Sequence, residues 1–261
     1  MQAYTAPDWT NVLHYNGLVT FDDFWQLDAG WYEPPNRRRG GWSGVSRCAL
    51  NLPEGGTVGI FLKRQENHTS RSWARPVRGI LTFTREIANL IRFQQYDIPS
   101  LTPIFFEQRT KNGDEQAVIV TAELSGYRSL EDLTTEWRGG GRPNYQKRLQ
   151  LIQAVANTVR RMHEHRLQHR CLFPKHILVK FLADNGIDVR IIDLEKTKWR
   201  PLRIFATLRD LDTLSRRSIG WSRPDRLRFL LAYYQAKRLS PQIKRVWRYI
   251  DRKGNRKIIA K

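Results

Sequence analysis

The chain has 261 residues, 40% of them hydrophobic, which is enough to bury a core in one large domain or in two lobes. Forty-five Lys and Arg against 25 Asp and Glu give a formal charge of +20, which favours an anionic partner: nucleic acid, an acidic membrane surface or a phosphorylated substrate. Two cysteines, Cys48 and Cys171, are too few for a disulfide framework or a credible zinc site, so reduced thiols are expected.

The first third of the chain is predicted to contain a pair of strands. Residues 1–30 mix aromatic with acidic side chains and are expected to pack as an extension on the adjoining part of the chain. A loop rich in Gly and Arg then leads into an apolar, β-branched segment, and the turn LPEGG separates it from TVGIFLKRQ. This pattern predicts two paired strands, the second of which contains Lys63.

A helix and a hairpin are predicted next. A basic connector at residues 67–79 leads to apolar residues at helical spacing, which predict a helix that contains Glu86 and ends before Pro99. The apolar segments LTPIFFEQ and EQAVIVTAEL flank the turn KNGDE and indicate a β-hairpin.

The second half is predicted to be mainly helical. Residues 144–167 place apolar side chains on one helical stripe, and the short segments HILVKFLA and VRIIDLE form a hairpin around ADNGID. Helices are predicted again at residues 209–217 and 223–238, before a basic end at residues 250–261. We therefore expect an α+β fold of two lobes, comprising residues 1–121 and 122–261.

The segment HRCLFPKHIL, residues 169–178, has the shape of a protein-kinase catalytic loop, H-R-D-x-x-x-x-N. Cys171 stands where the catalytic Asp belongs, and His176 where the metal-binding Asn belongs. The order of the predicted elements is also that of a kinase: a Gly-containing loop, a strand with a Lys, a helix with a Glu, the HRC loop and a later Asp. The sequence therefore predicts a bilobal protein-kinase-like fold.

Phosphoryl transfer requires a cation on the nucleotide phosphates, a carboxylate that aims it, and a metal-binding carboxylate. Lys63, Glu86 and Asp193 match these roles in order, although Leu-Glu replaces the usual Phe-Gly after Asp193. Taken singly, a Lys or a Glu at such a position is more often a solvated side chain. The evidence for a kinase is therefore the occurrence of all three residues in this order, and not any one of them alone.

Two features of the set leave alternatives open. GGWSGV departs from G-x-G-x-x-G, so Gly40 and Gly41 either cradle phosphate or form a simple flexible turn. Cys171 either acts as a thiolate base, with a pKa lowered by Arg170 or Lys175, or is an inert thiol, and we favour the inert thiol.

The residues HEHRLQHRCLFPKHILV, the following IIDLEKTKWR and WSRPDRLRFLLAYY resemble the lipopolysaccharide kinases of the Kdo/WaaP and InaA type. The resemblance extends from about Val45 to about Tyr234. It implies a kinase-like bilobal fold, ATP with Mg²⁺ as phosphoryl donor, and a hydroxyl of heptose or Kdo in the lipopolysaccharide inner core as acceptor.

The resemblance also implies site residues. Lys63 is similar to the family's nucleotide lysine and Glu86 to its partner. His169 and Arg170 are similar to the opening of the catalytic loop, and Asp193 to the metal-binding Asp.

Further residues complete the implied site. His176 matches the His that this family has in place of the kinase Asn, and is expected at the metal with Asp193. Glu123, Gly40 and Gly41 are expected at the nucleotide. Cys171 departs from the active members, which have Asp there, and this departure affects the general base but neither the fold nor the nucleotide pocket.

Three functions remain, in order of preference. The first is an active sugar kinase acting on the lipid A-core glycolipid, and the second is a kinase-like module without catalysis, in lipopolysaccharide assembly or an envelope stress response. The third is a nucleic-acid binder, but the basic residues suit a phosphorylated glycolipid at an anionic membrane equally well, so no nucleic acid is expected.

The predicted location is cytoplasmic, with peripheral attachment to the anionic inner membrane. No apolar run approaches the roughly 18 residues of a membrane-spanning helix, and MQAYTAPDW lacks the features of a secretory signal. The basic runs RRRGG and RKGNRK are expected to face the membrane surface.

Overall fold

A computed structural model describes residues 3–38, 40–72 and 75–258, without the side chains of residues 71–78, 138 and 252–258. The internal contacts divide the chain into two compact units. Unit 1 comprises Met1–Gln94 and Leu101–Ser125, and unit 2 comprises Gln95–Ser100 and Gly126–Lys261.

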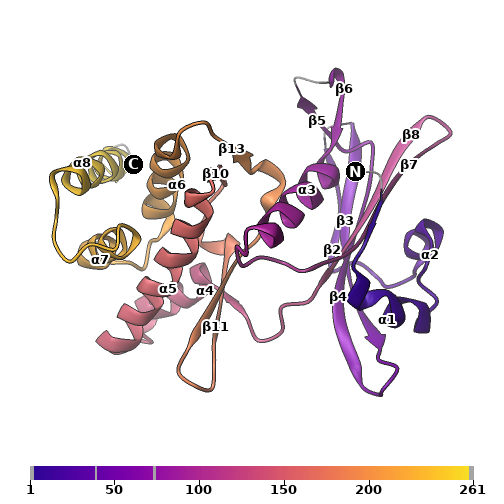
Figure 1. The fold of residues 1–261 in the computed structure, drawn as a ribbon, viewed down its shortest axis with the longest axis horizontal. Helices are drawn as coiled ribbons and strands as arrows, with labels where there is room; N and C mark the ends of the chain where they lie inside the picture. Colours follow the sequence, from indigo (N-terminus) through magenta and orange to yellow (C-terminus); the bar gives the residue numbers. More distant parts are fainter. Residues whose placement is uncertain (1–2, 39, 73–74, 259–261) are drawn as a thin grey trace. The chain divides into compact units, whose positions relative to one another are not determined.

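Unit 1 is built on a six-stranded antiparallel sheet in the order β1-β7-β8-β4-β3-β2 (Figure 1). Its strands are β1 (Ala3–Thr5), β2 (Glu33–Arg38), β3 (Gly41–Asn51), β4 (Thr57–Glu66), β7 (Pro103–Lys111) and β8 (Asp114–Ala122). The predicted strand pair and hairpin are therefore confirmed as β3–β4 and β7–β8. Lys63 lies in the middle of the sheet, opposite Val45 of β3 and Ile119 of β8.

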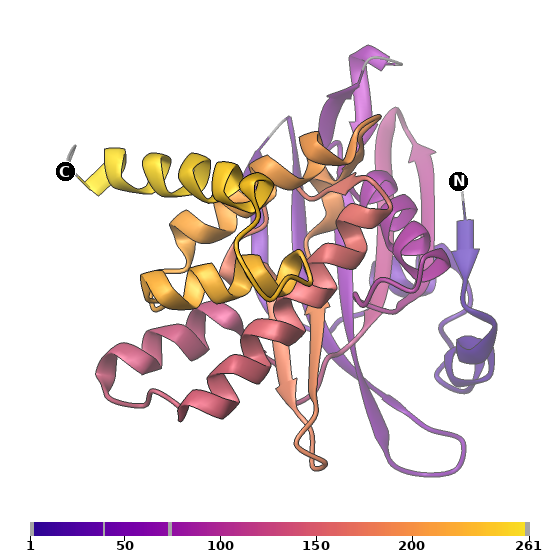
Figure 2. The same cartoon turned by 60° about the vertical axis from the view of Figure 1, so that its left-hand side comes forward.

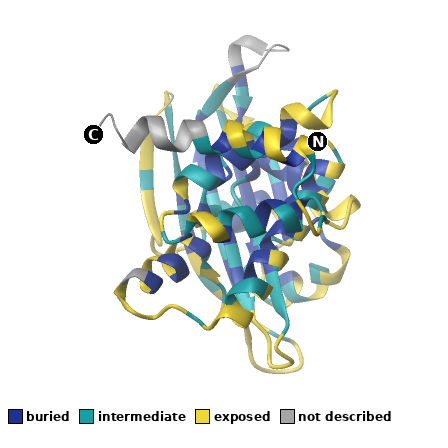
Figure 3. Ribbon diagram, turned by 90° about the vertical axis from the view of Figure 1, so that its left-hand side faces the viewer, coloured by how far each residue is buried: buried dark blue, intermediate teal, exposed yellow. Residues whose placement is uncertain are grey.

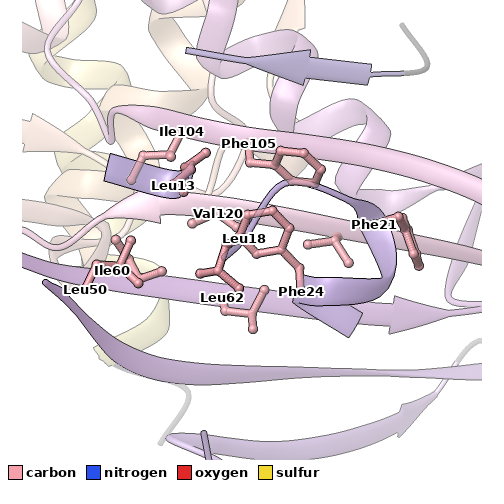
Figure 4. Packing of buried hydrophobic residues seen from close by; sticks show 11 residues of the cluster. Leu13, Leu18, Phe21, Phe24, Leu50, Ile60, Leu62, Ile104, Phe105 and Val120 are labelled. Carbon is pink, nitrogen blue, oxygen red and sulfur yellow. The ribbon is translucent and has the colours of Figure 1, made fainter. Parts of the chain in front are cut away.

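The N-terminal segment packs on this sheet, as predicted for residues 1–30. It contains the 3-10 turn η1 (Pro7–Trp9) and the helices α1 (Thr10–Tyr15) and α2 (Phe21–Gln26). Thr20 and Asp23 form a capping box at the start of α2, which satisfies backbone N–H groups that the helix leaves open. Figure 4 shows the resulting core, in which buried side chains of the segment meet those of the sheet: Leu13, Leu18, Phe21, Phe24, Leu50, Ile60, Leu62, Ile104, Phe105, Val118 and Val120.

The expected basic connector is a hairpin instead. Strands β5 (Thr69–Ser72) and β6 (Arg75–Leu81) pair antiparallel, with Thr69 opposite Leu81. The many basic residues of this segment conceal the alternation that signals a strand, which is why the sequence pattern did not reveal it. The predicted helix follows as α3 (Thr82–Gln95) and contains Glu86.

Unit 2 is mainly helical, as predicted (Figure 2). Its helices are α4 (Leu130–Glu136), η2 (Trp137–Gly139), α5 (Tyr145–Glu164), η3 (Pro174–His176), η4 (Leu194–Lys196), α6 (Arg203–Arg217), α7 (Arg223–Tyr233) and α8 (Pro241–Ile258). Its strands are β9 (Arg128–Ser129), β10 (Leu167–Gln168), β11 (Ile177–Phe181), β12 (Ile187–Ile191) and β13 (Lys198–Trp199). The predicted hairpin is confirmed as β11–β12.

Helix α8 was not predicted, because its basic residues suggested only a charged end. Ile243, Val246 and Ile250 are nevertheless buried on one side of it, at helical spacing. The helix packs against α6 and α7. Buried and exposed positions also occur side by side along the other helices of unit 2 (Figure 3), which is typical of amphipathic helices covering a core. No helix in the described residues is long and apolar enough to cross a membrane.

Candidate active site

Lys63 and Glu86 form an ion pair within unit 1. The Lys63 ammonium on β4 lies 2.7 Å from a carboxylate oxygen of Glu86 on α3. The Lys63 side chain is 20% exposed and that of Glu86 is 7% exposed. A buried carboxylate therefore holds a partly exposed cation in a fixed position, which is the pairing that phosphoryl transfer requires of a kinase Lys and Glu.

Most of the predicted loop rich in Gly and Arg belongs to β2 and β3 instead, with Gly40 in the turn between these strands and Gly41 at the start of β3. Gly40 has φ +81°, a conformation that residues with a Cβ rarely adopt. A Cβ on Gly41 would lie 2.0 Å from the carbonyl oxygen of Glu66, and one on Gly44 would lie 2.5 Å from the Trp31 ring. Close packing thus explains Gly41 and Gly44, while Gly40 and Gly41 remain candidates for contact with phosphate.

Glu123 follows β8 and lies across Gly59 of β4. Its carboxylate accepts a hydrogen bond from Arg47 Nε at 2.8 Å, and its backbone N–H donates to the Gly59 carbonyl. A Cβ on Gly59 would overlap the Glu123 carboxylate, so the glycine makes this arrangement possible. The expected contact of Glu123 with a nucleotide stays a prediction, and the geometry offers an ion pair with Arg47 as its present role.

His169 opens the HRC loop of unit 2 and is completely buried. Its Nε2 lies 2.9 Å from the Ile192 carbonyl, and its Nδ1 accepts the backbone N–H of Cys171 at 3.3 Å. Both contacts are satisfied when the neutral ring has its proton on Nε2, and burial correspondingly lowers the pKa of His169. His169 therefore positions the loop and does not face solvent.

Asp210 on α6 holds the backbone of the HRC loop. Its carboxylate accepts the N–H of His169 at 2.6 Å and that of Arg170 at 2.8 Å. The same carboxylate lies 3.2 Å from Nε2 of His163 on α5, and Asp210 and His163 are both completely buried. Arg170 is held at φ +71°, a conformation that few residues other than Gly adopt.

Sequence reasoning did not assign a role to Asp210. The segment RDLDTL contains two acidic residues, Asp210 and Asp212, that a periodicity argument cannot separate. An Asp on the buried stripe of an amphipathic helix was the available signal, because a buried carboxylate requires several donors.

Backbone hydrogen bonds at Cys171 fix the turn of the HRC loop. Its carbonyl oxygen accepts the N–H of Phe173 at 2.7 Å and lies 2.9 Å from Nδ1 of His176. The thiol is free and its residue is half-buried. Because the described hydrogen bonds that fix this turn involve backbone atoms of residue 171, the loop geometry does not depend on which side chain stands there.

His176 and Asp193 face each other. The Nδ1 of His176 donates to the Cys171 carbonyl, which leaves Nε2 with a lone pair in the neutral ring. That Nε2 lies 3.4 Å from Oδ2 of Asp193, whose side chain is 38% exposed. Asp193 itself has φ +62°, a conformation that Asp tolerates better than most residues. The backbone N–H of Ile192 donates to the His176 carbonyl and ties the two segments together.

The donors here fit Mg²⁺ through Asp193. Magnesium is usually held by one or two carboxylates together with phosphate oxygens and water, and imidazole is a less common ligand for it. No group of three or more His, Cys, Asp or Glu suited to a metal occurs among the described residues. A metal at this place would therefore need oxygens from a bound nucleotide and water.

The predicted site residues thus fall into two sets. Within unit 1 the structure brings Lys63 and Glu86 together, and places Gly40 and Gly41 at the β2–β3 turn. Within unit 2 it brings together His169, Arg170, Cys171, His176 and Asp193.

These features define a protein of the kinase-like fold: a β-rich unit with a Lys–Glu ion pair, and a helical unit with an HR loop and a following Asp. A solved structure described as WaaP in complex with acyl carrier protein has the same fold, with a TM-score of 0.70 and 22% identity. The alignment covers 98% of this chain and 99% of that one. The profile of the lipopolysaccharide kinase (Kdo/WaaP) family matches residues 22–233, and the chain belongs to this family.

Three similar proteins agree with the assignment to the Kdo/WaaP family. The chain is 28% identical over 196 residues to protein InaA of Escherichia coli K12, which covers 75% of this chain and 87% of InaA. It is also 28% identical over 193 residues to the lipopolysaccharide core heptose(I) kinase WaaP of Pseudomonas aeruginosa, covering 68% of this chain and 70% of that kinase. The heptose(I) kinase WaaP of Escherichia coli is 26% identical over 165 residues.

Proposed function

We propose that the chain is an ATP-dependent kinase that phosphorylates heptose or Kdo in the lipopolysaccharide inner core. The observation that supports this best is the Lys63–Glu86 ion pair, together with Asp193 beside His176. A Lys that a buried Glu holds at 2.7 Å in the middle of the sheet matches the group that orients nucleotide phosphates.

Each residue has a role in this proposal. Lys63 donates to the α- and β-phosphates, Glu86 orients Lys63, and Gly40 and Gly41 allow the backbone to approach phosphate. Asp193, with His176, would hold Mg²⁺, which supplies positive charge to the β- and γ-phosphates when bound. His169 and Asp210 hold the HRC loop in its conformation.

Cys171 limits the rate and does not exclude the reaction. Phosphoryl transfer passes through a loose transition state, so positioning and electrostatics provide most of the acceleration, and a side-chain base contributes about 10²–10⁴-fold. A soft thiolate is a poor substitute for a carboxylate near a hard cation. We therefore propose slow transfer without a side-chain base.

A second candidate is a kinase-like module that binds nucleotide without transferring phosphate. Cys171 in place of the usual Asp favours it. Both candidates bind ATP. They differ in phosphate transfer, because only the kinase transfers the γ-phosphate to lipopolysaccharide core.

Lys63→Met should weaken ATP binding by tenfold or more, because a charge-assisted hydrogen bond is worth about 1.5–3 kcal/mol. Titration calorimetry with ATP and Mg²⁺ measures this. Lys111→Met, which removes an exposed lysine at the end of β7, is the matched control and should bind as the wild type does. Equal affinity and equal turnover in the wild type and Lys63→Met would remove Lys63 from the site.

We also propose peripheral attachment to an anionic membrane surface. Among described residues, Lys244, Arg245 and Arg248 are exposed on α8, opposite its buried apolar side. Arg39 and the side chains of RKGNRK lie outside the described residues. Each basic residue near such a surface contributes about 1 kcal/mol at low salt.

Vesicles rich in anionic lipid should therefore sediment with the protein at low salt and release it at about 1 M salt, where the Debye length is about 3 Å. Replacing Lys244, Arg245 and Arg248 by Gln should weaken the binding by one to two orders of magnitude or more. Sedimentation that is unchanged at high salt would show that the attachment is not electrostatic.

A further inference from the structure

A cavity of about 300 Å³ lies among the helices of unit 2, away from the HRC loop and Asp193. It is lined by residues of α5, α6, α7 and the start of α8, which Figure 2 shows as the large helices of this unit. The volume is at the lower end of the range for small-molecule sites, about 300–1,000 Å³. The proposed kinase reaction assigns no role to this cavity.

Two arginines give the cavity a positive wall. Arg160 of α5 pairs with Glu164 through Nη1 at 2.6 Å, and 22% of its side chain is exposed. Arg203 of α6 has no carboxylate within ion-pair distance among the described residues, and its guanidinium lies 5.9 Å from the centre of the Tyr233 ring. The cavity therefore offers guanidinium N–H groups that can donate to an anionic ligand.

Besides Glu164, which pairs with Arg160, and the apolar Ile204, the rest of the wall consists of neutral hydrogen-bonding groups. Tyr234, Gln235 and Gln242 line the cavity beside the arginines. Burial raises the pKa of Tyr234 to about 12, so its hydroxyl keeps its proton and remains a donor at neutral pH. Guanidinium groups match the oxygens of phosphate, and amides and a phenol match hydroxyl groups. This combination suits a small ligand that has both phosphate and hydroxyls.

A buried chain of hydrogen bonds links the cavity wall to the HRC loop. The hydroxyl of Tyr233 lies 3.1 Å from the hydroxyl of Thr207 and 3.0 Å from Nδ1 of His163. His163 contacts Asp210 through Nε2, and Asp210 accepts the backbone N–H groups of the loop. Tyr233, His163 and Asp210 are all completely buried, so the hydrogen bonds among them are shielded from water.

We propose that this cavity binds a phosphorylated sugar or polyol, and that its occupancy stabilises the HRC loop through Tyr233, His163 and Asp210. A ligand phosphate held by Arg160 and Arg203 restricts the side chains around Tyr233. Packed side chains and hydrogen-bond networks carry energetic coupling between sites when they have two discrete arrangements, and hydrogen exchange at the loop measures whether this network does so.

Titration calorimetry with glucose 6-phosphate tests the binding. The measurement uses the full-length Lys63→Met protein, in which the proposed nucleotide site is impaired. Binding of the sugar phosphate at that site then does not contribute to the measured heat. Arg203→Gln, an exposed position that should not disturb folding, and Arg160→Gln should each weaken binding about tenfold or more. Arg209→Gln, on the same helix and outside the cavity, should leave the affinity unchanged. Equal affinity in all three variants, or no binding by the Lys63→Met protein, would overturn the proposed site.

Three further probes define the ligand class. Inorganic phosphate should bind more weakly than glucose 6-phosphate, and gluconate, which has a carboxylate and no phosphate, should bind weakest. Vesicles containing phosphatidic acid should not compete with glucose 6-phosphate if the ligand is a small soluble molecule. Competition by the vesicles would overturn the assignment to a soluble sugar or polyol.

Hydrogen exchange tests the link to the loop. Glucose 6-phosphate should slow exchange of the His169 and Arg170 amides in the Lys63→Met protein. Tyr233→Phe, which removes the hydroxyl that contacts His163, should retain binding within about threefold and lose the slowed exchange. Unchanged exchange at these amides on binding would overturn the link.

Discussion

An Asp193→Ala variant should transfer no measurable phosphate from ATP to lipopolysaccharide core, whereas Cys171→Ala should keep most of the wild-type rate. Asp193 would provide the carboxylate for Mg²⁺ beside the HRC loop, so its removal takes away the charge that the β- and γ-phosphates require. Cys171 contributes hydrogen bonds through its backbone, and alanine preserves them. Single-turnover transfer assays with folded, ATP-binding protein measure both rates.

Cys171→Asp should raise the rate by about 10²–10⁴-fold, because it restores a carboxylate base on a loop whose shape is already set. Cys48→Ala, at the other free cysteine, is the matched control and should not change the rate. If Cys171→Ala is as damaging as Asp193→Ala, the thiol itself is catalytic. If the wild type transfers no phosphate and Asp193→Ala changes only nucleotide affinity, the chain is a binding module.

Asp210→Ala should lower the free energy of unfolding by about 3–5 kcal/mol, the usual result of removing one partner from a buried polar network. The substitution leaves the buried N–H of His169 and the partly buried N–H of Arg170 without their acceptor, and removes a contact of His163. Urea unfolding measures the change, and hydrogen exchange at the two amides should accelerate.

Asp251→Ala is the control for this experiment. Asp251 pairs with Arg223 at 3.0 Å near the surface, and exposed ion pairs contribute at most about 1 kcal/mol. Equal losses of stability in Asp210→Ala and Asp251→Ala would mean that Asp210 does not hold the HRC loop.

The sequence predicts those parts of the fold whose signals are local. The strand that contains Lys63, the helix that contains Glu86 and the hairpin before Asp193 each follow from apolar periodicity over a few residues, and the structure contains all three. The ordered set of Lys, Glu, HR loop and Asp also predicted the kinase-like fold, and the resemblance of the segments around the HRC loop indicated the family. The fold match and the family profile confirm both.

Other features depend on residues far apart in the chain. Asp210 acquires its role only when α6 packs beside the HRC loop, and Gly44 is required only because the Trp31 ring lies against it. The sequence pattern also missed helix α8, because its many basic residues obscure the apolar positions that pack inward. It missed the β5–β6 hairpin as well, whose segment is likewise basic. Spacing along the chain cannot reveal such contacts.

Mass analysis of the lipopolysaccharide core tests directly whether this chain phosphorylates it. Core oligosaccharide is purified from cells that have the chain, from cells that lack it, and from cells with Asp193→Ala. Only the core from cells that have the unaltered chain should carry an additional phosphate group on a heptose or Kdo. Identical masses in all three, from cells in which the protein is present and folded, would contradict it.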